Sequence, residues 1–246
     1  MHSFNRASTR PKYSQFIHVV YLLIISGVIT AHAQSSLFNV PTTDVIGEGR
    51  GYVEADLDVN PARFRDGGWR SYGFVGIYGV NKRTEIGVNA YSLRTAEGFA
   101  PVELQPNIKY RVYNNETYGV AVSVGAIAYV PVSKRFRRET LGSVYAVASK
   151  QFNGDRSPRF TGGTYRLIGP NAADDSRAGF LLGVEQPLVD RVTFIADWNS
   201  GKNRLGYSAG GVGIGLTKRS YLSAAYYFGN QGPRNNFLGI YYGYSF

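Results

Sequence analysis

Acidic side chains occupy every second position in one stretch of the sequence, at Glu54, Asp56 and Asp58. This alternation is typical of a β-strand, because successive side chains of a strand point to opposite faces. On the inner wall of a barrel, these carboxylates and Glu85 of the segment 84–93, set against Lys109 and Arg111, would line a passage for small solutes. They could equally belong to a closed, internally hydrogen-bonded set of charges that only stabilises the barrel. The other inward candidates are Asn89, Glu103 and Asp197.

The sequence has few of the side chains that catalytic and metal sites use. Histidine occurs only at positions 2, 18 and 32, and cysteine is absent. The chain after Ala33 therefore lacks the groups that Ser-His-Asp and Cys-His nucleophiles and histidine-based zinc sites require. A calcium-loop start at 56–60 fails because Gly67 stands where the loop needs Glu. The glycine-rich stretches 47–51 and 211–215 do not continue into helices, so they lack the context of a phosphate loop. We expect no enzymatic activity, no metal and no cofactor.

Basic residues gather in two stretches that we expect to be external loops. Guanidinium groups pair with phosphate through two hydrogen bonds, so docking on lipopolysaccharide phosphates is chemically sensible. Simple solvation of the loops is the alternative. The basic candidates are Arg63, Arg65, Lys134, Arg135, Arg137 and Arg138.

The segment 1–33 has the layout of a secretory signal peptide. Arg6, Arg10 and Lys12 precede an apolar run at 17–29, and small residues at 31–33 supply a cleavage site. The run is too short for a spanning helix, which needs about 20 apolar residues. Three of the 27 basic side chains and none of the 17 acidic ones lie in this segment, so 34–246 carries a net charge of +7. For an exported chain, this charge favours contact with the lipid phosphates of the envelope rather than with nucleic acid.

The remaining chain shows the period-two alternation of β-strands and no window with helical periodicity. Most of the alternating segments are near the length that a tilted strand needs to cross a bilayer, which is about 10 residues. A soluble sandwich could alternate in the same way. The twelve segments are 51–59, 69–79, 84–93, 102–113, 118–130, 140–152, 159–167, 178–186, 192–199, 205–217, 221–228 and 237–246.

The connections favour a membrane barrel, which has short turns at one end and longer loops at the other. Terse connections at 81–83, 114–117, 187–190 and 218–220 mostly alternate with longer ones. The longer connections are 60–68, 94–101, 131–139, 168–177 and 229–236, while 153–158 and 200–204 fit the alternation less well.

The end of the chain carries the most specific pattern. Apolar or aromatic residues stand at every second position from Leu238, and the last of them are Tyr242, Tyr244 and Phe246. This resembles the β-signal of bacterial outer-membrane proteins, in which a terminal Phe is recognised by the barrel-assembly machinery. The resemblance implies insertion into the outer membrane by that machinery. At the other end, the run 39–44 with Gly49 is similar to the opening of a poorly characterised, porin-like group of outer-membrane barrels.

Together these patterns predict an all-β, antiparallel transmembrane barrel of 12 strands, with 10 and 14 as alternatives, in the bacterial outer membrane. We expect residues 34–50 to form a periplasmic lead-in or a short plug before the barrel at 51–246. The expected function is a passive, non-enzymatic channel for small solutes. The alternatives are a structural or surface-interaction barrel with a blocked lumen that binds lipopolysaccharide or a partner through its basic loops, and a barrel enzyme.

The first testable prediction is that the mature protein begins at Gln34. N-terminal sequencing of the protein from the membrane fraction should return Gln34 as the first residue, or a blocked end from its cyclisation. Recovery of peptides that contain Arg6 or Ile17 would contradict the expected cleavage.

Overall fold

The computed structural model describes residues 35–133, 140–154, 156–169 and 176–246, and its strands join in one antiparallel sheet. No helix in these ranges is long and apolar enough to span a bilayer. The strands are β1 (Gly51–Val59), β2 (Arg70–Asn81), β3 (Thr84–Thr95), β4 (Gly98–Phe99), β5 (Glu103–Asn115), β6 (Val120–Pro131), β7 (Leu141–Gln151), β8 (Arg159–Ile168), β9 (Ala178–Val189), β10 (Val192–Asn199), β11 (Tyr207–Gly215), β12 (Ser220–Gly229) and β13 (Phe237–Ser245).

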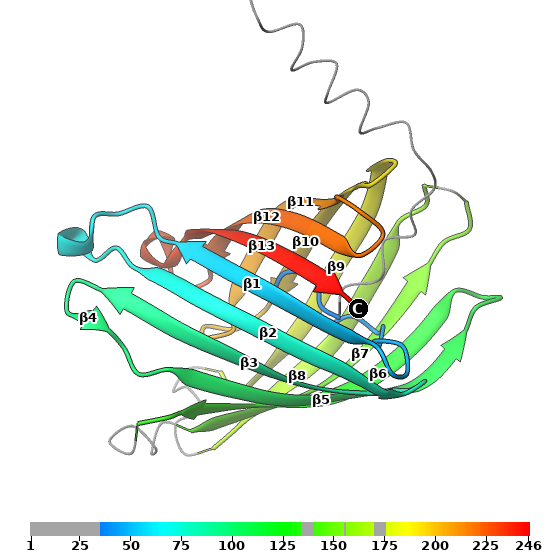
Figure 1. The fold of residues 1–246 in the computed structure, drawn as a ribbon, viewed down its shortest axis with the longest axis horizontal. Coiled ribbons are helices and arrows are strands. Elements are labelled where there is room, and N and C mark those ends of the chain that lie inside the picture. The colour runs from blue at the N-terminus through cyan, green and yellow to red at the C-terminus, as the bar shows by residue number, and fades with distance from the viewer. Residues whose placement is uncertain (1–34, 134–139, 155, 170–175) are drawn as a thin grey trace, which may run out of the picture.

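The sheet closes on itself because β1 pairs with both β2 and β13, while β2 also pairs with β3 (Figure 1). Every other neighbour pair is consecutive along the barrel, apart from β4, which pairs only with the end of β3. The expected 12-stranded antiparallel barrel is therefore confirmed. β4 is an extra two-residue strand within the longer connection that we expected at 94–101.

The pleat directs one set of side chains outward and the other inward. On β5, Ile108 is 47% exposed, whereas the adjacent Lys109 is 3% exposed. Such an apolar outer surface suits contact with the hydrocarbon of a bilayer. A water-soluble protein would have polar residues over most of this surface. Large apolar side chains on the outside include Val53, Phe74, Ile86, Val88, Phe180, Leu182, Phe194 and Ile240.

The two ends of the barrel differ in their connections. At the short-turn end, neighbouring strands are joined by 82–83, 116–119, 152–158, 190–191 and 216–219. At the long-loop end, the connections are 60–69, 96–102, 132–140, 169–177, 200–206 and 230–236. One expected turn is misplaced, because β9 continues through Pro187 to Val189. A register shift opposite Val192 accommodates this proline, which cannot donate a ladder hydrogen bond.

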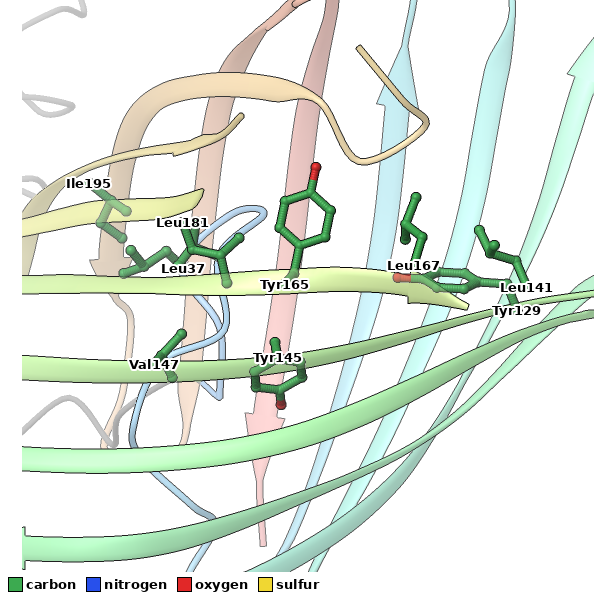
Figure 2. Packing of buried hydrophobic residues seen from close by; sticks show 10 residues of the cluster. Leu37, Tyr129, Leu141, Tyr145, Val147, Tyr165, Leu167, Leu181 and Ile195 are labelled. Atoms are coloured by element: carbon green, nitrogen blue, oxygen red, sulfur yellow. The ribbon is translucent and has the colours of Figure 1, made fainter. Parts of the chain in front are cut away.

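Part of the inner wall is apolar, whereas the inward candidates expected from the sequence are all polar or charged. Leu37 and Val40, from the segment before β1, pack against inward side chains of β6 to β10, and Figure 2 shows Leu37 beside Leu181. The inward faces of these strands mix apolar residues with polar ones such as Ser123, Ser149 and Thr161, so the period-two pattern does not single out the apolar cluster. The wall residues of this cluster are Tyr129, Leu141, Tyr145, Val147, Tyr165, Leu167, Leu181 and Ile195.

The C-terminal residues complete the seam between β13 and β1. Tyr242, Tyr244 and Phe246 are 46%, 38% and 63% exposed on the outer surface. The backbone N–H and C=O of Phe246 exchange two hydrogen bonds with Gly51, each 2.9 Å between N and O. The last residue therefore extends the closing ladder past the end of β13.

We predict that deletion of Phe246 strongly reduces assembly into the outer membrane. The deletion removes two hydrogen bonds from the closing seam and the outward aromatic ring. The matched control is Ser245→Ala, which keeps the chain length and the backbone ladder. The measurement is the membrane yield of heat-modifiable protein on gels of boiled and unboiled samples, and equal yields of the two variants would refute the prediction.

We also predict opposite tolerance of arginine at adjacent positions of β5. Ile108→Arg should destabilise the folded barrel by about 2 to 4 kcal/mol, because a charge near the bilayer midplane leaves water for hydrocarbon. Asn107→Arg at the same depth points into the aqueous interior and should change stability little. Urea titrations of folding into lipid vesicles measure both effects, and equal tolerance of the two changes would reject the lipid-facing position of Ile108.

Candidate functional site

A cavity of about 730 Å³ occupies the part of the barrel interior that faces β1, β2, β3 and β5. Its wall reaches Trp69, Pro101, Pro131 and Arg204, which lie in or beside the connections of the long-loop end. It is also lined by residues 35–39 and Pro41 of the segment before β1. On the side walls, the lining continues from the long-loop end to Tyr52, Ile77 and Glu85, near the short-turn ends of β1, β2 and β3. Seven of the nine expected inward residues line it: Glu54, Asp56, Asp58, Glu85, Asn89, Glu103 and Lys109.

The carboxylates of β1 are held in place by tyrosine hydroxyls of other strands. Tyr91 of β3 donates to Asp56 Oδ2 at 2.7 Å, and Tyr241 of β13 donates to Asp58 Oδ1 at 2.8 Å. Tyr91 reaches Asp56 across β2, where Gly73 lies between them in the register. A Cβ on Gly73 would stand 2.3 Å from the Tyr91 ring, so this position needs glycine for the ring to cross. Glu54 accepts a hydrogen bond from Tyr52 on the same face of β1.

The two basic residues of the cavity wall are both engaged in ion pairs. Lys109 Nζ lies 3.2 Å from Glu85 Oε1 on the neighbouring strand β3. Arg204, in the connection between β10 and β11, holds Glu103 of β5 through two N···O contacts of 2.8 and 3.0 Å. Of the acidic residues expected opposite Lys109, only Glu85 contacts it, and the β1 carboxylates do not. Arg111 lies outside the cavity wall, and its guanidinium donates to the carbonyl of Lys82 in the β2–β3 turn.

Residues 35–42 form a tight turn inside the barrel, which we call the N-terminal hairpin. Its arms are joined by the hydrogen bonds Leu37 N–H to Val40 O at 2.8 Å and Thr42 N–H to Ser35 O at 3.1 Å. Leu37 and Val40 at its tip are 2% and 0% exposed. Leu37 packs over Gly183 of β9, where a Cβ would lie 2.1 Å from the leucine Cδ1.

Asp197 of β10 binds the tip of the hairpin. Its Oδ2 accepts the backbone N–H groups of Phe38, Asn39 and Val40 at 2.5 to 3.0 Å, and its Oδ1 accepts the side-chain amide of Asn39 at 3.0 Å. A carboxylate that receives several N–H donors satisfies backbone groups that the apolar surroundings would otherwise leave unpaired. Asp197 is thus an inward residue, but it serves the hairpin rather than the cavity wall.

A second set of contacts holds the base of the hairpin and residues 43–46. Lys109 Nζ donates to Ser35 O at 2.5 Å and to Asp44 O at 3.0 Å, and Glu85 accepts the N–H of Ile46 at 2.7 Å. Arg159 forms ion pairs with both Asp44 and Glu185. Sequence analysis missed Arg159 and Glu185, although both alternate with outward apolar neighbours on β8 and β9 and could have been found from that pattern.

Aromatic rings form the wall of the cavity next to Asp58. Tyr227 and Phe237 stack with ring centroids 4.0 Å apart and an interplanar angle of 12°. Tyr207 meets Phe237 edge-on at 5.4 Å, and Trp69 lies 5.2 Å from the same ring. Phe38 of the hairpin approaches Tyr227 at 6.2 Å. These five residues all line the cavity. The sequence shows them only as alternating aromatics, without indicating that they meet.

Of the basic loop residues, only Arg63 and Arg65 lie within the described residues. Both are exposed beside the 3-10 turn η1 (Phe64–Asp66), and Arg65 is 3.8 Å from Asp66. Lys134, Arg135, Arg137 and Arg138 lie outside the described residues. Docking of these side chains on lipopolysaccharide phosphates stays a prediction.

Comparison of the whole chain with known proteins finds likeness in structure alone. No protein-family model matches the sequence, and no curated protein matches it. Among solved structures, an outer membrane channel from Pseudomonas putida F1 is similar with a TM-score of 0.50 at 13% identity, over 83% of this chain and 98% of that chain. At this identity the likeness concerns the fold and not the activity.

Two further structures are similar at lower TM-scores. The outer membrane phospholipase A from Escherichia coli has a TM-score of 0.47 at 11% identity, over 80% of this chain and 92% of that chain. The toluene transporter TbuX from Ralstonia pickettii has a TM-score of 0.45 at 10% identity, over 81% and 90%. The closed 12-stranded sheet, its apolar outer surface and the fold shared with the Pseudomonas channel make this chain a β-barrel of the bacterial outer membrane.

Proposed function

We propose that this protein is a non-enzymatic channel. Small solutes enter the barrel from its long-loop end and pass through it across the outer membrane. The observation that carries the proposal is the cavity of about 730 Å³, which runs inside the barrel from the long-loop end and is walled by carboxylate, amide and hydroxyl groups. In barrels of this kind the short turns face the periplasm and the long loops face outward. A solute would therefore enter the cavity from outside the cell.

The N-terminal hairpin restricts this passage in the proposed mechanism. It lies between the cavity and the contacts of Asp44 with Arg159, so a solute has to pass it to reach the short-turn end. The hairpin is joined to the barrel wall by side-chain contacts and has no ladder hydrogen bonds with the wall strands. It can therefore move without opening the sheet, and its position would set the conductance.

A structural barrel with a blocked lumen is the second candidate. The observation in its favour is the burial of Leu37 and Val40 in the apolar half of the inner wall. Undocking the hairpin exposes these side chains to water, and burial of one such side chain is worth about 1.5 to 3 kcal/mol. A hairpin that never leaves would make the cavity a closed pocket and not a channel. The two candidates therefore differ in conductance.

The channel proposal predicts that weakening the hairpin anchor raises conductance. Asp197→Asn removes the negative charge that receives the hairpin N–H groups, and loss of such bonds costs about 1 to 3 kcal/mol. The undocked fraction should then rise by about tenfold. Single-channel recordings in planar bilayers should show small conductance steps for the wild type and larger or more frequent openings for the variant.

Asp190→Asn, which removes an exposed carboxylate from the β9–β10 turn, is the matched control and should behave as the wild type. Gly183→Val tests the same idea independently, because its side chain would take the space of Leu37. Silence of the wild type, Asp197→Asn and Gly183→Val alike, with all three folded, would reject the channel in favour of the blocked barrel.

A further inference from the structure

The wall of the cavity has more acidic than basic groups to offer to a solute. Its two basic residues, Lys109 and Arg204, are each committed to an ion pair with a carboxylate of the wall. Asp56 and Asp58 line the same cavity and form no ion pair with a basic side chain among the described residues. The cavity therefore contains two carboxyl groups that no basic side chain of the described residues pairs with.

Asp56 in particular has an acceptor atom that no group in the described part of the protein fills. Its side chain is 7% exposed, its Oδ2 receives the Tyr91 hydroxyl, and its Oδ1 has no hydrogen-bond partner. A buried carboxylate oxygen without a partner is costly, since it has lost water and gained nothing in return. Asp58, two positions along the same face, has a single hydrogen bond on Oδ1 from Tyr241. The two carboxylates are placed to attract a cation in the cavity through charge, and Asp56 Oδ1 can also accept a hydrogen bond from a cation that carries an N–H.

The wall next to these carboxylates is aromatic. Tyr241, which binds Asp58, lies 6.4 Å from Tyr227, and Tyr227 stacks on Phe237. Trp69 extends this surface toward the long-loop end. Aromatic faces carry negative electrostatic potential and attract cations that shed their water easily, organic ammonium groups above all. Carboxylates and ring faces on one cavity wall form the arrangement that recognises such cations.

We propose that the cavity binds small organic ammonium cations, with the charged nitrogen beside Asp56 and Asp58 and the apolar body against the aromatic wall of Trp69, Tyr227 and Phe237. The volume of about 730 Å³ lies within the range of small-molecule sites. The inference names the solute class of the proposed channel and rests on that function for passage of the solute, while binding itself requires no conduction.

Two other classes of ligand fit less well. No three carboxylates among the described residues are grouped so as to coordinate a metal ion. A hydrated inorganic cation would also gain little from the ring faces, because it holds its water tightly. Anionic solutes would meet Asp56 and Asp58 without a free base to offset them. A cation with an apolar surface can contact both the carboxylates and the aromatic rings of the wall.

The experiment compares choline with its uncharged isostere 3,3-dimethyl-1-butanol, by isothermal titration of the folded protein in detergent at constant ionic strength. The two probes share shape and differ in charge, so the difference in affinity isolates the cation. We expect choline to bind the wild type about tenfold more tightly than the alcohol. Equal affinity for the two probes, or absence of choline binding, would overturn the proposal.

Variants of the carboxylates locate the site. Asp56→Asn and Asp58→Asn should each weaken choline binding by about tenfold and leave binding of the alcohol unchanged. Glu97→Gln removes an exposed carboxylate in the connection between β3 and β5, at the same end of the barrel, and should bind choline as the wild type does. Either aspartate variant can carry the test if the other fails to show the heat-modifiable migration of a folded barrel. Wild-type affinity in the folded variants would contradict the assigned site.

Conductance separates this inference from the proposed function. Choline binding by a protein that shows no conductance in any variant would support the site and reject the channel. Conductance without choline binding would support the channel and reject the site.

Discussion

Hydrocarbon offers no hydrogen-bond partners, so each backbone N–H and C=O of a membrane-spanning strand must pair with a neighbouring strand. In this chain the requirement is met by closure of β1 onto β13, with Phe246 and Gly51 extending the ladder by one more pair. Closure decides the rest of the molecule. It fixes which side chains meet lipid, and it creates an interior that must be either filled or wetted. In this barrel part of the interior is filled by the segment before β1 and part is a cavity.

The division follows the composition of the strands. The inward residues of β6 to β10 include an apolar cluster that would be poorly hydrated alone, and the N-terminal hairpin packs against it with Leu37 and Val40. A chain segment buried in that way brings its own backbone donors, and Asp197 accepts those of the hairpin tip. The inward residues of β1, β3 and β5 are polar and remain next to the cavity. One inserted segment thus fills the interior beside the apolar cluster and leaves a cavity beside the polar residues of β1, β3 and β5.

Sequence reasoning was most accurate where the pattern depends on the membrane alone. Alternation gave the bounds of β1 and β10 to the residue and the other barrel strands to within a few positions, because each strand meets lipid on one face. It was least accurate for the interior. Whether Lys109 faces an open lumen or pairs with Glu85 depends on strand register and on the path of residues 35–46, and no local pattern encodes either. The partners of Asp197 lie near the opposite end of the chain, at 38–40. Its alternation with apolar neighbours therefore showed that the side chain points inward, but not that it binds the hairpin.

The pairing of charges inside the barrel also accounts for the character of the cavity. Lys109 and Arg159 bind the segment before β1 and thereby draw Glu85, Asp44 and Glu185 into ion pairs at its base. These pairs withdraw basic groups from the lumen, since a guanidinium or ammonium committed to a carboxylate and a backbone carbonyl has few donors left. Asp56 and Asp58, on the far side of the barrel from Arg159, are then left with tyrosine hydroxyls as partners. Lys109 and Arg159 are thus used in holding the N-terminal segment, and a solute that enters the cavity meets Asp56 and Asp58 without either base beside them.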